Sequence, residues 1–429
     1  MYFTLMIIIF ILGYAMIALE HPIKINKSAT ALLLAVVIWT VFSVFGPGFE
    51  HNLLVEHLGE TSEILFFLLG AMTIVEIVDR HEGFSIITDK IKTTNKRKLL
   101  WIISILTFFM SAVLDNLTTA IVMVALLRKL IDNKQERWFF AGMVILAANA
   151  GGAWSPIGDV TTIMLWIKGN ITAGMIIVET FIPSLVSLLV PLTAITFVLK
   201  GDVKRPEAND SVGNPVVISN KQSNLIFFIG IGSLLFVPIF KTITHLPPYM
   251  GILFGLGLMW VITEIMHVAN EDNYTKLNVN AILRKVDTSS VLFFLGILMA
   301  VAALQTAGHL ELLSKSLDKL GDIYIINIII GLLSSIIDNV PLVAAAMGMY
   351  PIAEVGHFAQ DGAFWEFLAY CAGTGGSILI IGSAAGVAVM GMEKIDFIWY
   401  LKKISLWALL GYFAGAGVFI LISKFILHT

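Results

Sequence analysis

Long apolar stretches alternate with short polar segments along the whole chain. A helix of about 20 apolar residues crosses ~30 Å of hydrocarbon, so each stretch of that length is a candidate membrane span. The pattern predicts ten spans, near residues 2–19, 28–45, 62–79, 139–166, 172–199, 223–240, 249–267, 289–306, 366–391 and 404–423. Because only helices and closed barrels satisfy backbone polar groups in lipid, we expect an all-α polytopic membrane protein.

Two further apolar segments, 99–127 and 323–350, have polar centres. The first would form a single helix roughly 43 Å long, too long for an ordinary span. A single crossing would also place the basic loop 128–138 opposite the basic loop 80–98, against the positive-inside rule. A re-entrant hairpin at 99–130, which enters and leaves on one side, keeps both loops cytoplasmic.

The two predicted hairpins are related in sequence. Ser111-Ala-Val-Leu-Asp115-Asn116 aligns with Ser334-Ser-Ile-Ile-Asp338-Asn339, and segments on either side align at nearly the same offset. Each half then has five spans and one hairpin, and because five is odd the second copy is inverted. In both halves the span after the hairpin contains a cluster of glycines that favours a broken helix, typical of a transporter's central site.

This repeat divides the chain into two halves and a linker. The predicted units are a first inverted repeat at 1–199 with hairpin 99–130 and broken helix 139–166, a cytoplasmic linker at 200–222, and a second inverted repeat at 223–429 with hairpin 323–350 and broken helix 366–391.

Composition and charge narrow the function. Hydrophobic residues make up 58% of the chain and charged residues 13%, against about 45–50% and 25% in soluble domains. The single cysteine, Cys371, excludes an intrachain disulfide, and the net charge of −3 argues against nucleic acid as a partner. On the predicted topology all 27 Lys and Arg lie in loops, which leaves no basic residue within the membrane.

Five carboxylates nevertheless fall inside the predicted hydrophobic zone. They are Glu76, Asp115, Asp159, Glu179 and Asp338. Each costs roughly 2.5–3.5 kcal/mol to insert, so each is expected to have a partner or a function. Without Lys or Arg nearby, the remaining partners are protons, metal cations and dipoles, and we expect a site for mobile cations.

The candidate ion- and proton-binding residues lie at the hairpin tips and helix breaks: Asp115, Asn116, Thr118, Asn149, Ser155, Asp159, Thr162, Asp338 and Asn339. Secondary candidates are Glu76, Glu179, Ser377 and Ser383. Na⁺ is expected at Asp115 and Asp159, since hard oxygen ligands suit a small hard cation. The competing interpretation is structural: an aspartate at a hairpin tip or helix break can simply cap a helix, and Glu76 can extend to the interface.

Several segments resemble the NhaD-type Na⁺/H⁺ antiporters of the ion transporter superfamily. They are Ala18-Leu-Glu-His21 with Asn26-Lys27, Phe66 to Thr73, Leu114 to Thr119, Asn149 to Thr162, and Ile337 to Pro341. The resemblance extends over nearly the whole chain. The resemblance implies a bacterial inner-membrane protein that exchanges Na⁺ or Li⁺ for H⁺ without a cofactor. It also implies a homodimer and an elevator-like motion of the hairpin-bearing part.

Two other functions are kept as alternatives. An arsenite or organic-anion permease of the same superfamily would need a basic residue or thiol at the site, and only Cys371 lies near a predicted break. An intramembrane aspartyl protease could use Asp115 and Asp159 as a dyad. However, Pro156-Ile-Gly-Asp159 lacks the Gly-x-Gly-Asp pattern of that family, and a protease has no need of Asp338. A transporter, not an enzyme, is therefore expected.

Overall fold

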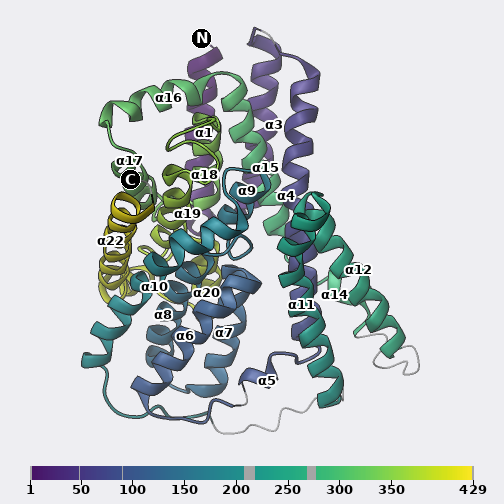
Figure 1. Cartoon of the computed structure of the whole chain (residues 1–429), viewed down its shortest axis with the longest axis vertical. Coiled ribbons are helices and arrows are strands. Elements are labelled where there is room, and N and C mark those ends of the chain that lie inside the picture. Colours follow the sequence, from purple (N-terminus) through teal and green to yellow (C-terminus); the bar gives the residue numbers. More distant parts are fainter. Residues whose placement is uncertain (1, 48, 89, 207–217, 268–276, 428–429) are drawn as a thin grey trace.

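The computed structural model describes the whole chain except residues 1, 48, 89, 207–217, 268–276 and 428–429 (Figure 1). Half of the predicted linker 200–222 and part of the predicted loop 268–288 therefore lie outside the described residues. The described part consists of helices joined by loops and contains no β-strand beyond two isolated bridges. This confirms the all-α prediction.

Within the described part of the chain, eight helices are long and apolar enough to cross a membrane. They are α3 (Lys27–Phe45), α4 (His51–Arg80), α6 (Lys96–Leu114), α10 (Ala173–Val198), α11 (Asn220–Thr244), α12 (Pro248–His267), α15 (Thr288–Thr306) and α22 (Ser405–Ile422, extended to Phe425 by the π-helix η2 at Ser423–Leu427). Together with the shorter apolar helix α1 (Tyr2–Ala18), they make the chain a multi-pass membrane protein.

Six helices form one part of the molecule, which we call the frame: α1, α3, α4, α11, α12 and α15. In it, α3 packs against α1 and α15, and α12 packs against α11 and α4. The buried His81 at the end of α4 and His267 at the end of α12 share a hydrogen bond of 2.8 Å between their Nε2 atoms. Figure 1 shows α3 and α15 side by side in its upper half and α11 and α12 together at the right.

The second part, which we call the core bundle, contains the hairpins and the broken helices. Its elements besides α6, α10 and α22 are α7 (Asn116–Leu130), α8 (Lys134–Gly152), α9 (Val160–Ile167), α17 (Ile323–Leu333), α18 (Asn339–Met349), α19 (Ala363–Gly375) and α20 (Ala384–Glu393). The α6/α7 hairpin turns at Asp115, and the second hairpin turns between α17 and α18 at residues 334–338. Residues 153–159 and 376–383 interrupt the helices after each hairpin, as the glycine clusters predict.

Glycines allow the hairpins to lie very close to the broken helices. A Cβ at Gly151 in α8 would overlap the carbonyl oxygen of Phe108 in α6, and a Cβ at Gly375 in α19 would overlap that of Gly331 in α17. The two contacts occupy equivalent positions of the proposed repeat. Any larger residue would push the hairpin and broken helix apart.

The short elements lie at the ends of these two parts: α2 (Glu20–Ile23), α5 (Ser85–Thr88), α14 (Val279–Leu283), α16 (His309–Leu317), η1 (Asp318–Leu320) and α21 (Phe397–Lys403).

Three of the loops predicted to be cytoplasmic lie together at one end, which we call the basic end. The Val203 N–H donates to Thr94 O at 2.8 Å, and the Asp132 N–H donates to Lys204 O at 2.9 Å. At the same end, Glu393 at the close of α20 is 1% exposed and pairs with Arg128 at 2.6 Å and Arg137 at 2.7 Å. In Figure 1, α6 and α7 lie in the lower half, nearest α5, whereas α17 and α18 lie in the upper half, below α16. The inversion of the repeat and its orientation in a membrane remain predictions.

Candidate functional site

Four helices of the core bundle begin at one polar cluster between the two hairpin tips and the two helix breaks. Their N-caps are Asp115 for α7, Asp159 for α9, Asp338 for α18 and Ser383 for α20, and each side chain accepts a backbone N–H of its own helix. The N-terminus of a helix carries a partial positive charge of about half an elementary charge. All three aspartates therefore cap helices, and the helix ends partly offset their charge.

Asp159 lies at the centre of this cluster and is 1% exposed. Its Oδ1 accepts from the Thr161 N–H at 2.9 Å and from the Thr161 hydroxyl at 3.0 Å. Its Oδ2 accepts from Asn116 Nδ2 at 2.5 Å and from Asn339 Nδ2 at 3.2 Å. Both hairpin tips therefore meet on the same carboxylate, one asparagine from each.

Asn149, at the end of α8, joins this carboxylate to the second broken helix. Its Oδ1 accepts from Asn116 Nδ2 at 3.1 Å, while its own Nδ2 donates at 2.9 Å to both Ser377 Oγ and Ser383 Oγ. The side chain is completely buried. The structure thus brings Asn116, Asn149, Asp159, Asn339, Ser377 and Ser383 into one hydrogen-bonded network.

Asp115 lies beside this network in an unusual backbone conformation. Its φ of 76° and ψ of 161° are rarely adopted by residues other than glycine. Thr118 supports it, donating its N–H at 2.7 Å to Oδ1 and its hydroxyl at 2.8 Å to Oδ2. The charge of Asp115 also acts on Asp159. Strain held at a charged tip of this kind is typical of a functional position.

Asp338, the acid of the second tip, has a partner that the sequence analysis excluded. Lys27 Nζ, at the start of α3 in the frame, lies 3.8 Å from Asp338 Oδ2, and the two side chains are 18% and 11% exposed. Lys27 also lies 4.4 Å from the ring centroid of Phe293 in α15. The expectation that no Lys or Arg would pair with these carboxylates is therefore wrong for Asp338, and also for Glu76, which pairs with Arg80. Loop 20–27 is predicted to be cytoplasmic, but its last residue, Lys27, lies beside Asp338 at the tip of the second hairpin.

Other predicted residues have local structural roles. The Ser155 hydroxyl donates to Ala112 O at 2.5 Å and joins the helix break to α6. The Thr162 hydroxyl bonds the backbone of Asp159 in a capping box. Glu76 pairs with Arg80 one turn away at 2.8 Å, in agreement with the alternative of an interfacial acid. Glu179 is buried in α10, and its charge acts on a second buried acid in α19.

Sequence reasoning missed three contributors. Thr161 makes two of the hydrogen bonds to Asp159, and in the sequence it lies within the segment Asn149 to Thr162 that carries the family resemblance. Tyr14 of α1 accepts the Asp338 N–H at 3.0 Å on its hydroxyl, and nothing in the sequence marks a tyrosine in the middle of a span. Glu366, the buried acid of α19, is fully enclosed. In the sequence, the position of Glu366 among the aromatic residues Phe364, Trp365 and Phe367 is the one sign that it is buried.

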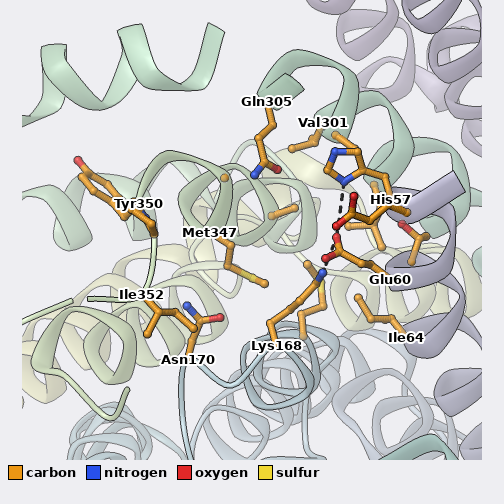
Figure 2. Close-up of a pocket in the computed structure, with 18 of the residues that line it drawn as sticks. His57, Glu60, Ile64, Lys168, Asn170, Val301, Gln305, Met347, Tyr350 and Ile352 are labelled. Carbon is orange, nitrogen blue, oxygen red and sulfur yellow. Dashed lines mark ion pairs between the residues drawn. The ribbon is translucent and has the colours of Figure 1, made fainter. Parts of the chain in front are cut away.

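A cavity of about 430 Å³ separates the frame from the core bundle at the end opposite the basic end (Figure 2). Glu60 of α4 pairs across it with Lys168 after α9 at 2.5 Å and lies 3.5 Å from His57 Nδ1. The cavity extends inward to Met164 of α9 and Ala344 of α18. They lie roughly 7.5 Å and 9 Å along their helices from the capping aspartates Asp159 and Asp338, so the cavity approaches the ion site from this end.

The chain is similar to known transport proteins along most of its length. The family model described as Citrate transporter matches residues 7–365. Sodium/proton antiporter 1 of Arabidopsis thaliana is 49% identical over 97% of this chain and 72% of its own length. The Na⁺/H⁺ antiporter NhaD of Vibrio cholerae is 30% identical over 97% of this chain and 91% of its own length. The chain belongs to the NhaD-type Na⁺/H⁺ antiporter family. The NhaD of Alkalimonas amylolytica is also 30% identical, over 98% of the chain.

Membership of the NhaD-type family makes the chain a transporter, not an enzyme, and argues against the aspartyl protease. The described residues contain no group of three or more His, Cys, Asp or Glu side chains that could hold a metal ion.

Proposed function

We propose that the chain exchanges Na⁺ or Li⁺ for protons across a membrane, with Asp159 as the carboxylate that both cations neutralise. One observation carries this proposal: Asp159 is fully enclosed, and asparagines from both hairpin tips bind the same oxygen. A carboxylate held where the two hairpin tips meet would change its partners and its exposure together if those tips moved. The names of the NhaD-type relatives support the same exchange.

The hydrogen-bond network around Asp159 supports the proposal that this site accepts Na⁺. Asn116 and Asn339 point their amide nitrogens at Asp159, which satisfies the carboxylate while no cation is bound. Rotating either amide by half a turn replaces nitrogen with oxygen at nearly the same position. The site would then offer carboxylate, amide and hydroxyl oxygens, the hard ligands that suit a small cation. Carbonyl groups of the broken helices would complete the shell.

Competition then couples the two ions without a second site. Asp115 and Asp338 both act electrostatically on Asp159, so the three acids favour any cation that lowers their repulsion. Either a proton or a sodium ion lowers this repulsion. Once one of them is bound, the site has less affinity for the other. Lys27 offsets Asp338, which leaves Asp115 and Asp159 as the pair expected to hold Na⁺.

An anionic substrate fits this site poorly, although the matching family model is described as Citrate transporter. The described polar cluster contains three aspartates and one lysine, and that lysine already faces Asp338. A carboxylate or arsenical oxyanion would meet net negative charge there. Cys371, the only thiol, is buried in α19 and lies against Gly331 of α17.

The setting of this activity follows from the family resemblance. We propose a bacterial cytoplasmic membrane with the basic end in the cytoplasm, a homodimer, and a core bundle that moves against the frame. The ion pair between Glu60 and Lys168 joins the two parts at the opposite end and would have to break during such a motion.

Lys27→Gln tests the role assigned to the lysine. Removing this charge leaves Asp338 uncompensated beside the site, so we expect the Na⁺ concentration for half-maximal exchange to fall severalfold and the maximal rate to fall with slower release. Lys24→Gln, an exposed lysine three residues earlier, is the matched control. Initial rates against Na⁺ concentration in proteoliposomes measure both effects. An unchanged half-maximal concentration would show that Lys27 does not act on the site.

The proposed function is tested by reconstituting the purified protein in liposomes with a trapped pH indicator. Added Na⁺ or Li⁺ should change the internal pH, whereas K⁺, citrate and arsenite should not. A response to citrate or arsenite instead of Na⁺ would support the permease alternative and contradict the exchange proposed here.

A further inference from the structure

A second group of acids lies in the core bundle away from the ion site. Glu366, in the first turns of α19, has an exposed fraction of 0%, and neither of its carboxyl oxygens has a hydrogen-bond partner among the described residues. Glu179 of α10 is 1% exposed and acts on Glu366 electrostatically. A buried carboxyl group costs several kcal/mol when it is ionised without a partner, so Glu366 needs an explanation.

The charges that act on Glu366 are all negative. They come from Glu179 and from Asp361, in the loop before α19. Among the described residues no Lys, Arg or His forms an ion pair with Glu366. Two neighbouring carboxyl groups in such a place cannot both be ionised at low cost, and a proton on one of them removes the conflict.

This group connects the molecular surface with the helix break. Asp361 is partly exposed, and its side chain accepts the Thr172 N–H at 2.5 Å at the start of α10. Glu366 follows five residues later. Two turns further along α19, on the same face, Gly373 packs against Ala153 at the end of α8, where a Cβ would lie 3.1 Å from the Ala153 Cβ.

Helix α10 contacts the same break at the residue after Glu179. The next residue, Thr180, has its hydroxyl 3.3 Å from Ala153 O, and it also donates to Ile176 O at 2.5 Å. Ala153 is the C-cap of α8, and its N–H donates to Asn149 O. The two glutamates therefore lie between the Asp361 loop and the backbone that carries Asn149.

We infer that Glu366 carries an exchangeable proton and forms, with Glu179, a proton-transfer station between the Asp361 loop and the helix break at Ala153. The inference rests on the proposed Na⁺/H⁺ exchange and adds a route for the proton. A proton leaves water beside Asp361 and forms an O–H bond on Glu366. It then moves to Glu179, and that bond breaks as it passes toward the ion site. Charge and atoms balance with no other reactant.

This route is separate from the one available to sodium. Neither glutamate lines the cavity that contains Glu60 and Lys168, nor does Asp361. A sodium ion needs several oxygens around it at every stage of its path, whereas a proton needs one acceptor at a time. The tightly packed surroundings of Glu366, between Trp365 and Phe367, suit only the proton.

Glu366→Gln keeps the size of the side chain and removes its ability to carry a proton. In proteoliposomes, we expect Na⁺-driven pH change to slow roughly a hundredfold, a typical effect of losing a positioned proton carrier. Exchange of radioactive Na⁺ for unlabelled Na⁺ moves no proton and should keep its wild-type rate. Glu366→Asp should recover much of the pH response, and Glu354→Gln, an exposed glutamate in the same loop region, should match the wild type in both assays.

Infrared spectroscopy supplies a readout that does not depend on transport. The wild type should show a carboxylic acid C=O band that shifts in D₂O and is absent from Glu366→Gln. Loss of both exchange modes in Glu366→Gln, or wild-type rates in both, would overturn the inference. A wild-type protein that shows no Na⁺-driven pH change would instead contradict the proposed function, so the two failures are distinguishable.

Discussion

Asp159→Asn is expected to reduce Na⁺-driven proton movement by roughly 100-fold or more while the protein folds and inserts normally. Asparagine caps a helix about as well as aspartate, so the start of α9 should lose at most a few tenths of a kcal/mol. The hydrogen bonds that the charged Asp159 carboxylate accepts are worth ~1.5–3 kcal/mol each and would be weakened. The negative charge that Na⁺ and H⁺ are proposed to neutralise would be lost. Asparagine keeps an oxygen ligand but has no ionisable group.

Other single substitutions rank the acids of the cluster. Asp115→Asn should have a similarly large effect, because asparagine keeps a capping oxygen but removes the ionisable group. Asp338→Asn should impair exchange, and Ser383→Ala should be milder, since no charge is lost. Asp322→Asn is the matched control: Asp322 caps α17 through the Tyr324 N–H at 2.7 Å, at the end of that helix away from the hairpin tip. Wild-type exchange by both Asp115→Asn and Asp159→Asn would show that these aspartates are structural caps only.

Gly151→Ala should have the largest effect on stability. The methyl group of the new alanine would overlap the carbonyl oxygen of Phe108, so α6 and α8 would have to move apart. Overpacking of this kind costs ~1–3 kcal/mol, and here the neighbour is backbone that cannot change rotamer. We expect a clear fall in the temperature of unfolding in detergent, measured by fluorescence-detected size exclusion.

Gly417→Ala is the control for this loss of stability. Gly417 lies within α22, where an added Cβ would have no atom within 4 Å, and alanine favours helix over glycine by ~1 kcal/mol. Its unfolding temperature should equal or exceed that of the wild type. Gly375→Ala should resemble Gly151→Ala, since it meets Gly331 in the same way. If Gly151→Ala unfolded at the wild-type temperature, close approach of the hairpin to α8 would not be needed.

The features that the sequence predicted well are those with a strong local cause. Glycine clusters and Pro156 weaken helix, and the breaks at 153–159 and 376–383 lie where they occur. The polar centre Asp115-Asn116 stops one helix and caps the next, which places the turn of the first hairpin correctly. The polar side chains of the hairpin tips and helix breaks form one cluster because these tips and breaks come together in the core bundle.

The sequence did not predict the contacts between side chains of elements that lie far apart in the chain. Lys27 belongs to a loop by its position, yet α3 begins at Lys27 and points it at Asp338, more than 300 residues later. Glu366 stood at the predicted edge of a span, but α19 begins three residues earlier and is enclosed by its neighbours. The hydroxyls of Ser155 and Thr162 looked like ligands, and backbone groups already use them.

Proton release on sodium binding tests the central claim, competition for Asp159, most directly. Purified protein in lightly buffered detergent solution is titrated with NaCl at constant ionic strength, and released protons are counted with a pH indicator against bound Na⁺. Competition predicts that protons are released as Na⁺ binds, that apparent Na⁺ affinity falls as the pH is lowered, and that Asp159→Asn abolishes the release while Asp322→Asn does not. Sodium binding without proton release, or release of the same size in Asp159→Asn, would contradict the account.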